Sequence, residues 1–316
     1  MKTINATQAV ASTISNKKLR EFARQLELQS MVWPGIVFLF IFSYIPMYGI
    51  IIAFKEYDLI SGFFAGRWVG FQYFQEFLID EKFIQVLRNT LGMNFLELVV
   101  GFPLTIVFAL LLNELTNLKF KKFVQTVSYL PHFISWIIFG GIVINLLMTE
   151  GLVNVLLLKI GLIDHPIYFL GNPNYFWIVS SFAGILKSFG FGAIIYIATI
   201  VSIDPGLYEA ATIDGAGRLQ KMWHVTLPGI MGTVVIMLIF AISSMVNLGF
   251  EQIYILQNSL NVDMSETIET YVYKMGLVNM RFSYSTAVGV FKSVVSMILL
   301  LVANYTAQKI TKHSLF

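Results

Sequence analysis

Long apolar stretches alternate with shorter polar connections along most of the chain. A helix needs about 20 mostly apolar residues to cross the hydrocarbon core of a bilayer, because each residue advances the helix by about 1.5 Å. Six stretches are long enough, and they cover residues 31–54, 91–113, 127–148, 176–203, 229–250 and 286–308. The pattern predicts an all-α polytopic membrane protein with six transmembrane helices and both chain ends on one side of the membrane.

Composition supports a membrane protein and excludes several other classes. Of the 316 residues, 57% are hydrophobic and only 12% are charged, which is more apolar surface than one soluble core can bury. The net charge of +3 comes from scattered lysines and arginines, so nothing favours binding to nucleic acid. The absence of cysteine excludes disulfides and thiolate metal sites.

The ends of the spans suggest how the chain is divided and oriented. The stretch 31–54 is too long for the apolar part of a signal peptide, so we interpret it as a retained first span. We therefore expect an N-terminal tail at 1–30, a transmembrane domain at 31–310 and a C-terminal tail at 311–316. Outside the spans, twelve lysines and arginines fall on the side of the tails and seven on the other side. Since positive residues are retained in the cytoplasm, the tails and the connection 204–228 should be cytoplasmic.

Three of the prolines in or beside the predicted spans carry a structural prediction. Pro46 and Pro103 lie inside spans, where the missing amide hydrogen leaves a carbonyl without a partner, so both predict kinks. Pro228 precedes the fifth span and suits the first turn of that helix, where an amide has no intrahelical partner.

The connection 204–228 predicts a compact pair of short helices. Asp204-Pro205-Gly206 ends the fourth span, and Glu209 then falls in the first turn of a short helix, where the helix dipole favours a carboxylate. Gly215-Ala216-Gly217 breaks this helix, and residues 218–225 form a second one. The second helix is predicted to be amphipathic. Its apolar side comprises Leu219, Met222 and Trp223, and its basic side comprises Arg218 and Lys221.

Three short sequences in this connection carry a resemblance to a known family. Glu209-Ala210-Ala211, Asp214-Gly215-Ala216 and Leu227-Pro228, in this order and spacing, resemble the EAA signature of type I binding-protein-dependent ABC importer permeases. The resemblance implies a permease fold of the MetI/MalF-like kind. It also implies that the connection contains a coupling helix, which docks in a groove of a separate ATPase subunit.

The family's roles can be carried over to matching residues of this chain. The resemblance implies that Glu209 contacts the ATPase, that Gly215 forms the turn, and that the residues from Leu207 to Trp223 fill the groove. The implied coupling residues are Leu207, Glu209, Ala210, Ala211, Asp214, Gly215, Ala216, Arg218, Leu219, Trp223 and Pro228. A competing interpretation is an amphipathic loop that lies on the lipid headgroups, which explains neither the Asp214-Gly215 turn nor the spacing.

The resemblance also implies partners and a cellular location. The chain has no phosphate-binding G-x-x-x-x-G-K-[ST] loop, so it should hold no cofactor and should not be an enzyme itself. ATP and Mg would be bound by two partner ATPase subunits. A second homologous permease subunit and an extracytoplasmic solute-binding protein would complete the importer in the bacterial cytoplasmic (inner) membrane.

Stretches further along the chain point to one branch of this family. Residues 247–254, 270–277 and 284–287 resemble the carbohydrate branch, in particular the LplB-type subunits. That branch implies import of oligosaccharides, including fragments of complex polysaccharides. Alternating access between two permeases would then move the sugar.

Polar residues inside the spans are candidates for a substrate path, because ionisable groups are costly in the membrane. Glu97, Lys187 and Lys292 are the three ionisable ones. A packing role is the alternative, in which the two lysines pair with Glu97 or Glu251. Aromatic rings beside polar groups suit sugars, so the candidate path comprises Glu97, Lys187, Ser243, Asn247, Phe250, Glu251, Tyr271 and Lys292.

Two other classes of protein remain as alternatives. An ion-coupled secondary transporter would need no ATPase, and the intramembrane Glu97 and Lys187 are its support. A membrane-embedded enzyme would need paired carboxylates, a metal motif or a nucleophile with a base, and the sequence contains no such set. The four histidines lack the spacing of metal ligands, so no metal site is expected.

Overall fold

The computed structural model describes residues 25, 29–58, 60, 62, 63 and 66–311, and it is built from helices. Within these residues, five helices are long and apolar enough to cross a membrane, and a bent pair makes a sixth. The predicted all-α polytopic fold is therefore confirmed. The predicted tails, 1–30 and 311–316, lie almost entirely outside the described residues.

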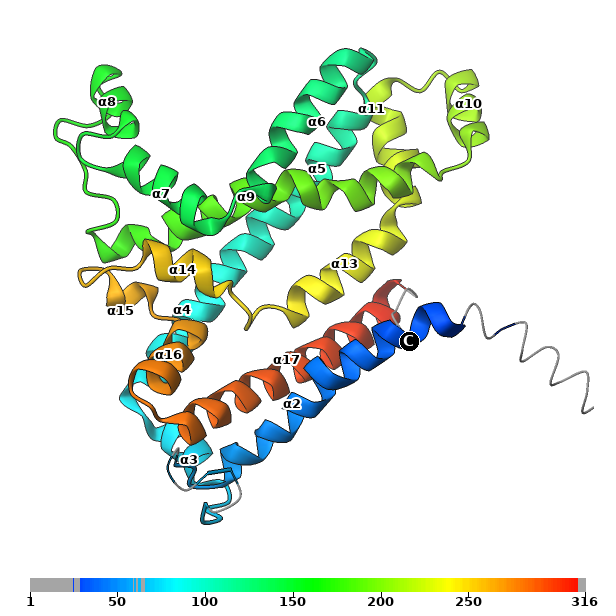
Figure 1. Cartoon of the computed structure of the whole chain (residues 1–316). Helices are drawn as coiled ribbons and strands as arrows, with labels where there is room; N and C mark the ends of the chain where they lie inside the picture. Colours follow the sequence, from blue (N-terminus) through cyan, green and yellow to red (C-terminus); the bar gives the residue numbers. More distant parts are fainter. Residues whose placement is uncertain (1–24, 26–28, 59, 61, 64–65, 312–316) are drawn as a thin grey trace, which may run out of the picture.

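The helices form two groups joined at one end of the molecule (Figure 1). In one group α17 (Phe282–Thr311) packs against the first span (Gln29–Phe54) and against α13 (Met231–Ser243). In the other, α9 (Pro173–Val201) packs against α5 (Phe102–Asn113) and α6 (Leu118–Phe133). Further helices are α3 (Gln72–Ile79), α4 (Glu81–Leu96), α7 (Trp136–Leu147), α8 (Leu152–Lys159), α14 (Phe250–Leu256), α15 (Val262–Ser265) and α16 (Ile268–Tyr273).

The third span differs from the sequence prediction of 127–148. Two helices share that stretch, because α6 ends at Phe133 and α7 begins at Trp136. Pro131 has no amide hydrogen to continue the helix, and Ser135 starts a new one by accepting the Ile138 amide with its hydroxyl (3.4 Å). The apolar stretch that can cross a membrane consequently runs over Trp136–Lys159.

The fifth span is shorter than the predicted 229–250. Helix α13 ends at Ser243, and α14 begins only at Phe250. The hydroxyls of Ser243 and Ser244 both bond the Phe240 carbonyl (2.8 and 2.7 Å), and such bonds compete with helix continuation. Irregular backbone of this kind is tolerated at membrane depth where it lines a cavity or is buried in protein.

Three prolines of the spans and the elbow follow widened helical turns. Pro46, Pro103 and Pro228 follow the π-helical turns Phe40–Tyr44, Glu97–Gly101 and Met222–Thr226. In each turn, the amide of the residue just before the proline bonds the carbonyl five residues back. The extra residue per turn accommodates a ring that would clash with an α-helical carbonyl. The second span continues as one helix over Glu81–Asn113, with the widened turn just before Pro103.

A half-buried carboxylate between α3 and α4 joins helices that are remote in the chain. Asp80 caps α4 by accepting the Lys82 amide (2.8 Å), and its other oxygen accepts the hydroxyls of Tyr271 (2.6 Å) and Tyr284 (2.9 Å). Both tyrosines are 1% exposed and pack on Phe77. This cluster fixes α4, α16 and α17 to one another.

We predict that Asp80→Asn destabilises the protein by about 1–3 kcal/mol, since buried hydroxyls lose a charged acceptor. Burial raises the pKa of the Asp80 carboxyl, but the hydrogen bonds it accepts outweigh burial and hold the pKa below its ordinary value of 3.8. The carboxylate therefore stabilises the fold above pH 3.8 and loses that effect as the pH falls through the lower folded value. Thermal unfolding in detergent should show the difference between wild type and variant shrinking with acidification.

The exposed Asp263 provides a matched control, since Asp263→Asn should leave the unfolding temperature unchanged. A destabilisation by Asp80→Asn that stayed constant down to the lowest pH would contradict the role given to this carboxylate.

Candidate functional site

The connection between α9 and α13 runs from Asp204 to Gly229 and forms a rigid pair of helical arms. We call it the elbow. Its first arm is α10 (Pro205–Ile213), which Asp204 caps by accepting the Gly206 amide (2.9 Å). Because Pro205 opens the helix, Glu209 is its fifth residue and lies beyond the first turn that the sequence predicts. Glu209 is exposed.

The predicted turn at Gly215 is confirmed. Gly215 has a φ of 78°, a left-handed conformation that favours glycine, and the Ala216 amide bonds the Ala211 carbonyl (2.9 Å). The second arm then runs through α11 (Arg218–Lys221) to α12 (Leu227–Gly229) without interruption. It is therefore longer than the predicted 218–225.

Pro228 lies in the last turn of this second arm and not in the first turn of the fifth span. The chain bends by 63° between Gly229 and Met231, and α13 starts only after the bend. The sequence prediction for Pro228 is wrong at this point, because the arm extends up to the bend.

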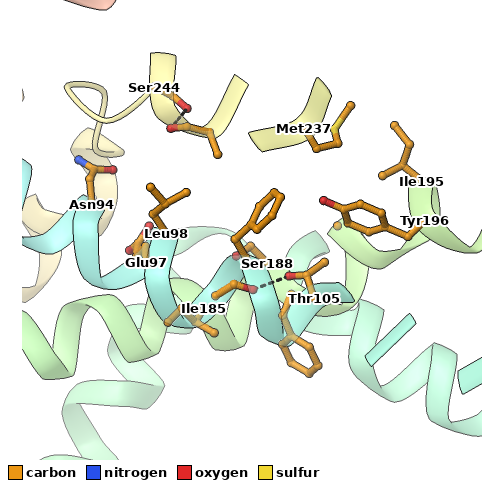
Figure 2. Close-up of a pocket in the computed structure, with 15 residues that line it drawn as sticks. Asn94, Glu97, Leu98, Thr105, Ile185, Ser188, Ile195, Tyr196, Met237 and Ser244 are labelled. Carbon is orange, nitrogen blue, oxygen red and sulfur yellow. Dashed lines mark hydrogen bonds between the residues drawn. The ribbon is translucent and has the colours of Figure 1, made fainter. Parts of the chain in front are cut away.

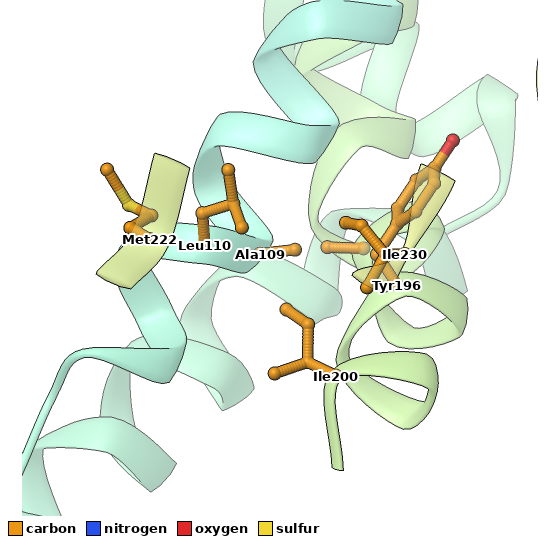
Figure 3. Packing of buried hydrophobic residues seen from close by; sticks show 7 residues of the cluster. Ala109, Leu110, Tyr196, Ile200, Met222 and Ile230 are labelled. Carbon is orange, nitrogen blue, oxygen red and sulfur yellow. The ribbon is translucent and has the colours of Figure 1, made fainter. Parts of the chain in front are cut away.

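The second arm is anchored in the protein interior. Met222 is 8% exposed and packs in a cluster from α5, α9 and the start of α13 (Figure 3), with Ala109, Leu110, Ala193, Tyr196, Ile200 and Ile230. The prediction that Met222 shares a side with Leu219 and Trp223 is wrong, since those two are exposed. The arms are tied by the Tyr208 and Thr226 hydroxyls (3.0 Å) and by Lys221, which donates to Thr212 (2.6 Å).

The elbow presents an apolar surface to its surroundings. Four large apolar side chains are 54–87% exposed, namely Leu207, Ile213, Leu219 and Trp223. Ile213 is the most exposed of them; it lies within the predicted range Leu207 to Trp223 but is not among the individually predicted coupling residues, because a single apolar residue before a turn carries no distinct signal. Exposed Ala210, Asp214 and Arg218 lie among them, while Ala211 and Ala216 are half-buried. A rigid surface of this kind is typical of protein interfaces.

A cavity of about 320 Å³ lies between the two groups of helices. Glu97 and Asn94 line it from the second span, and Ser244 and Met237 lie opposite them (Figure 2). The Glu97 carboxylate accepts the Gln252 side-chain amide (3.0 Å), which also donates to the carbonyl (2.9 Å) and hydroxyl (3.2 Å) of Ser180. Gly184 makes room for this network, because a Cβ there would lie 2.4 Å from the carboxylate.

A second polar region surrounds the break of the fifth span. Asn247 in the break donates to Ser296 of α17 (3.2 Å), and one turn earlier Lys292 pairs with Glu269 of α16. Tyr273 lies one turn after Glu269 on α16 and packs on Phe250 (ring centroids 4.9 Å apart). Phe250 is the first residue after the break. Tyr254 packs on both Phe250 and Tyr273, so the three side chains form an aromatic cluster. We call this set of residues the α14 patch. It comprises Asn247, Phe250, Tyr254, Glu269, Tyr273, Lys292 and Ser296.

The α14 patch brings together only part of the predicted substrate path. Asn247, Phe250 and Lys292 belong to it, and Ser243 and the exposed Glu251 flank the break. Tyr254, Tyr273 and Glu269 were missed, although their spacing by four residues along α14 and α16 is compatible with a shared face. Glu97 lies in the separate cavity, and Tyr271 is buried against Asp80.

The ion pairs expected from the sequence are not formed. Lys292 pairs with Glu269 rather than with Glu97 or Glu251, and Glu97 binds Gln252. Lys187 binds main-chain carbonyls of Pro131, His132 and Ile134. These partners lie far away in the sequence, so helical periodicity could not predict them. Within the described residues, no group of three or more His, Cys, Asp or Glu side chains is placed to hold a metal ion.

Comparison with known proteins decides the family. Residues 101–312, which include the elbow, match the model of the family described as "Binding-protein-dependent transport system inner membrane component". The chain belongs to this family. It is thus an ABC importer permease of the inner membrane. The predicted family and membrane location are confirmed.

Close relatives and solved structures cover nearly the whole permease. It is 43% identical to "Protein LplB" of Bacillus subtilis (strain 168), over 92% of this chain and 91% of the relative. It is 42% identical to the "Polygalacturonan/rhamnogalacturonan transport system permease protein YteP" of the same organism, over the full length of both.

A crystal structure of a bacterial ABC transporter "involved in the import of the acidic polysaccharide alginate" has a chain similar to this permease. The TM-score is 0.83 at 37% identity, covering 93% of this chain and 99% of that one. A second structure, of an alginate ABC transporter with an alginate pentasaccharide-bound periplasmic protein, gives the same TM-score and identity. The permease is therefore a transport subunit, and ATP is hydrolysed by partner subunits.

Proposed function

We propose that this permease moves oligosaccharides, including fragments of acidic polysaccharides, past the α14 patch by alternating access. Support for the substrate class comes from the relatives, which are named for polygalacturonan and rhamnogalacturonan or solved as an alginate importer. The observation that carries the proposal is the gathering of two polar pairs and three aromatic side chains around the break of the fifth span. Broken helices near the membrane midplane are where transporters typically bind their substrates.

The chemistry of the α14 patch fits a sugar acid. Aromatic rings of Phe250, Tyr254 and Tyr273 offer faces for the apolar sides of sugar rings, and Tyr254 is 51% exposed. Asn247 offers an amide for hydroxyl groups. Lys292 offers a positive charge, and its pairing with Glu269 leaves it 18% exposed. A carboxylate of a uronic acid can replace Glu269 as its partner as the sugar passes.

We propose that the elbow is the site at which ATP hydrolysis drives this movement. Its exposed apolar side chains fit a groove of an ATPase subunit, with Glu209 contacting that subunit and Gly215 holding the turn. Pro228 ends the arm beside the bend into α13, so a push on the elbow acts on the fifth span and thereby on the α14 patch. A second homologous permease, two ATPase subunits and an extracytoplasmic binding protein complete the importer.

Reconstitution tests the proposal against an ion-coupled transporter. The permease with its ATPase subunits, partner permease and loaded binding protein should accumulate galacturonate or mannuronate oligomers in proteoliposomes only when ATP is supplied. Each component omitted in turn should stop uptake. Uptake driven by a proton or sodium gradient in the absence of the ATPase would overturn the proposal.

We predict that Tyr254→Leu lowers uptake of these oligomers roughly tenfold, because losing one ring contact of about 1.4 kcal/mol in the path corresponds to a factor of ten. The leucine keeps an apolar side chain, so assembly and the ATPase activity stimulated by the loaded binding protein should remain. Uptake of labelled oligomers at limiting concentration measures the effect.

Tyr44→Leu is the matched control, since Tyr44 is 64% exposed on the first span and lies outside the α14 patch. Equal uptake by both variants would argue against the α14 patch as the substrate path.

A further inference from the structure

The break between α6 and α7 is closed by a side chain from a different span. Lys187, in the middle of α9, is 8% exposed, and its ammonium donates to the carbonyls of Pro131 (2.8 Å), His132 (3.1 Å) and Ile134. The last carbonyls of a helix have no amide partner within that helix. The lysine therefore supplies charge-assisted hydrogen bonds at the point where the main-chain ladder stops.

The same ammonium also contacts the beginning of α7. It lies 5.5 Å from the ring centroid of Trp136 and 5.6 Å from that of Phe139, within the range of cation–π attraction. Both rings belong to the first turn of α7. One charged group thus joins the end of α6 to the start of α7.

Helix α6 is held to α9 by further contacts next to the lysine. A Cβ on Gly190 would lie 2.2 Å from the Ser128 carbonyl oxygen, so the two backbones approach closely there. The His132 ring stacks on Phe191 with centroids 3.9 Å apart and planes 2° from parallel. Since α6 keeps these contacts without Lys187, removing the lysine should loosen mainly the angle at which α7 leaves the break.

The direction of α7 is passed on to α14. At Gly140, a Cβ would lie 2.6 Å from the Ile255 side chain, so α7 packs closely on α14 at this point. Ile255 follows Tyr254 directly, and Gln252 on the same short helix is fixed to Glu97. A change in the angle of α7 therefore displaces the helix that carries the aromatic part of the α14 patch.

We propose that Lys187 is a positioning residue for transport, whose ammonium sets the angle between α6 and α7 and so holds α14 in place. The sugar-path assignment of α14 rests on the proposed function, whereas the role in the helix angle does not. In this role Lys187 acts on the substrate path through α14 and does not contact the sugar itself.

Introduced cysteines can report the angle directly, because the chain has none of its own. Spin labels at Phe123→Cys on α6 and Ile142→Cys on α7 would sit at positions that are 64% and 46% exposed. In the assembled importer, Lys187→Met should broaden the distribution of label distances, and Lys187→Arg should keep it narrow. Lys159→Met, at an exposed lysine on α8, is the control and should change nothing.

Uptake of uronic-acid oligomers provides the second measurement. Lys187→Met should lower uptake roughly tenfold, a factor that corresponds to about 1.4 kcal/mol, with the ATPase subunits still bound. In Lys187→Ala, added propylammonium replaces the missing atoms and should restore uptake, which a misfolded protein would not permit. Tetramethylammonium, which has no N–H donor, should not restore it.

Two results would overturn the inference. One is an unchanged distance distribution in Lys187→Met, and the other is a broadened distribution with wild-type uptake. The label distances are read without sugar, so an error in the proposed substrate leaves the first measurement intact.

Discussion

Replacing Gly215 by valine is expected to stop ATP-driven uptake almost completely while the permease remains folded. A β-branched residue at a φ of 78° costs about 1–2 kcal/mol or more, and the turn must open to relieve the strain. Opening the turn separates the exposed apolar side chains of the two arms, which fill one groove together in the proposed coupling. Uptake into proteoliposomes should fall more than tenfold, because a misfit of about 1.4 kcal/mol already costs a factor of ten.

Gly217 supplies the matched control for this experiment. Its φ is −73°, and a Cβ there would meet Gln220 at an ordinary 3.7 Å. Gly217→Ala should therefore retain uptake and the ATPase activity stimulated by the loaded binding protein. Normal uptake by Gly215→Val would show that the elbow tolerates another turn and would remove the geometric basis for coupling.

The second large effect is expected from Gly190→Val in the middle of α9. Its Cβ would lie 2.2 Å from the Ser128 oxygen and 2.6 Å from the carbonyl carbon, so α6 and α9 would have to move apart. Forcing extra atoms into a packed interface typically costs about 1–3 kcal/mol. Thermal unfolding of the purified permease in detergent should show a clearly lowered midpoint and a reduced yield of folded protein.

Gly141→Ala on α7 tests whether replacing any helical glycine would lower the unfolding midpoint. No atom lies within 4 Å of a Cβ at that position, so alanine should be neutral or stabilise the helix by up to about 1 kcal/mol. A midpoint unchanged by Gly190→Val would contradict the close approach of α6 and α9 at this glycine.

The membrane spans illustrate what apolar length alone can predict. The predicted first, second, fourth and sixth spans correspond to single helices, with ends that move by a few residues or extend into polar sequence such as Glu81. The third and fifth fail because apolar length carries no information about where a helix stops. Ser135 starts a new helix inside one stretch, and Ser243 with Ser244 ends another.

The elbow was predictable because its signals are local. Asp204, Pro205 and Gly215 act through their own backbone preferences and short hydrogen bonds, so their spacing in the sequence was enough. Met222 was misplaced because two sides of a short helix were assigned from periodicity, and the contact that buries it comes from α5 and α9.

The ionisable residues inside the membrane were recognised as important, but their partners were not. The sequence identifies Glu97, Lys187 and Lys292 by the cost of placing charge in lipid. Gln252 lies 155 residues from Glu97, and the carbonyls that receive Lys187 lie more than 50 residues from it. Main-chain carbonyls are present at every residue, so no side-chain pattern marks those that a broken helix leaves available.

The sequence by itself determined a helical membrane protein with a compact elbow between two spans, because hydrophobic length and turn chemistry act over a few neighbouring residues. Only the tertiary structure decided where spans break, which charges meet, and that residues of three helices form the α14 patch. Those outcomes depend on distances between segments that are remote in the chain, and packing in three dimensions sets such distances.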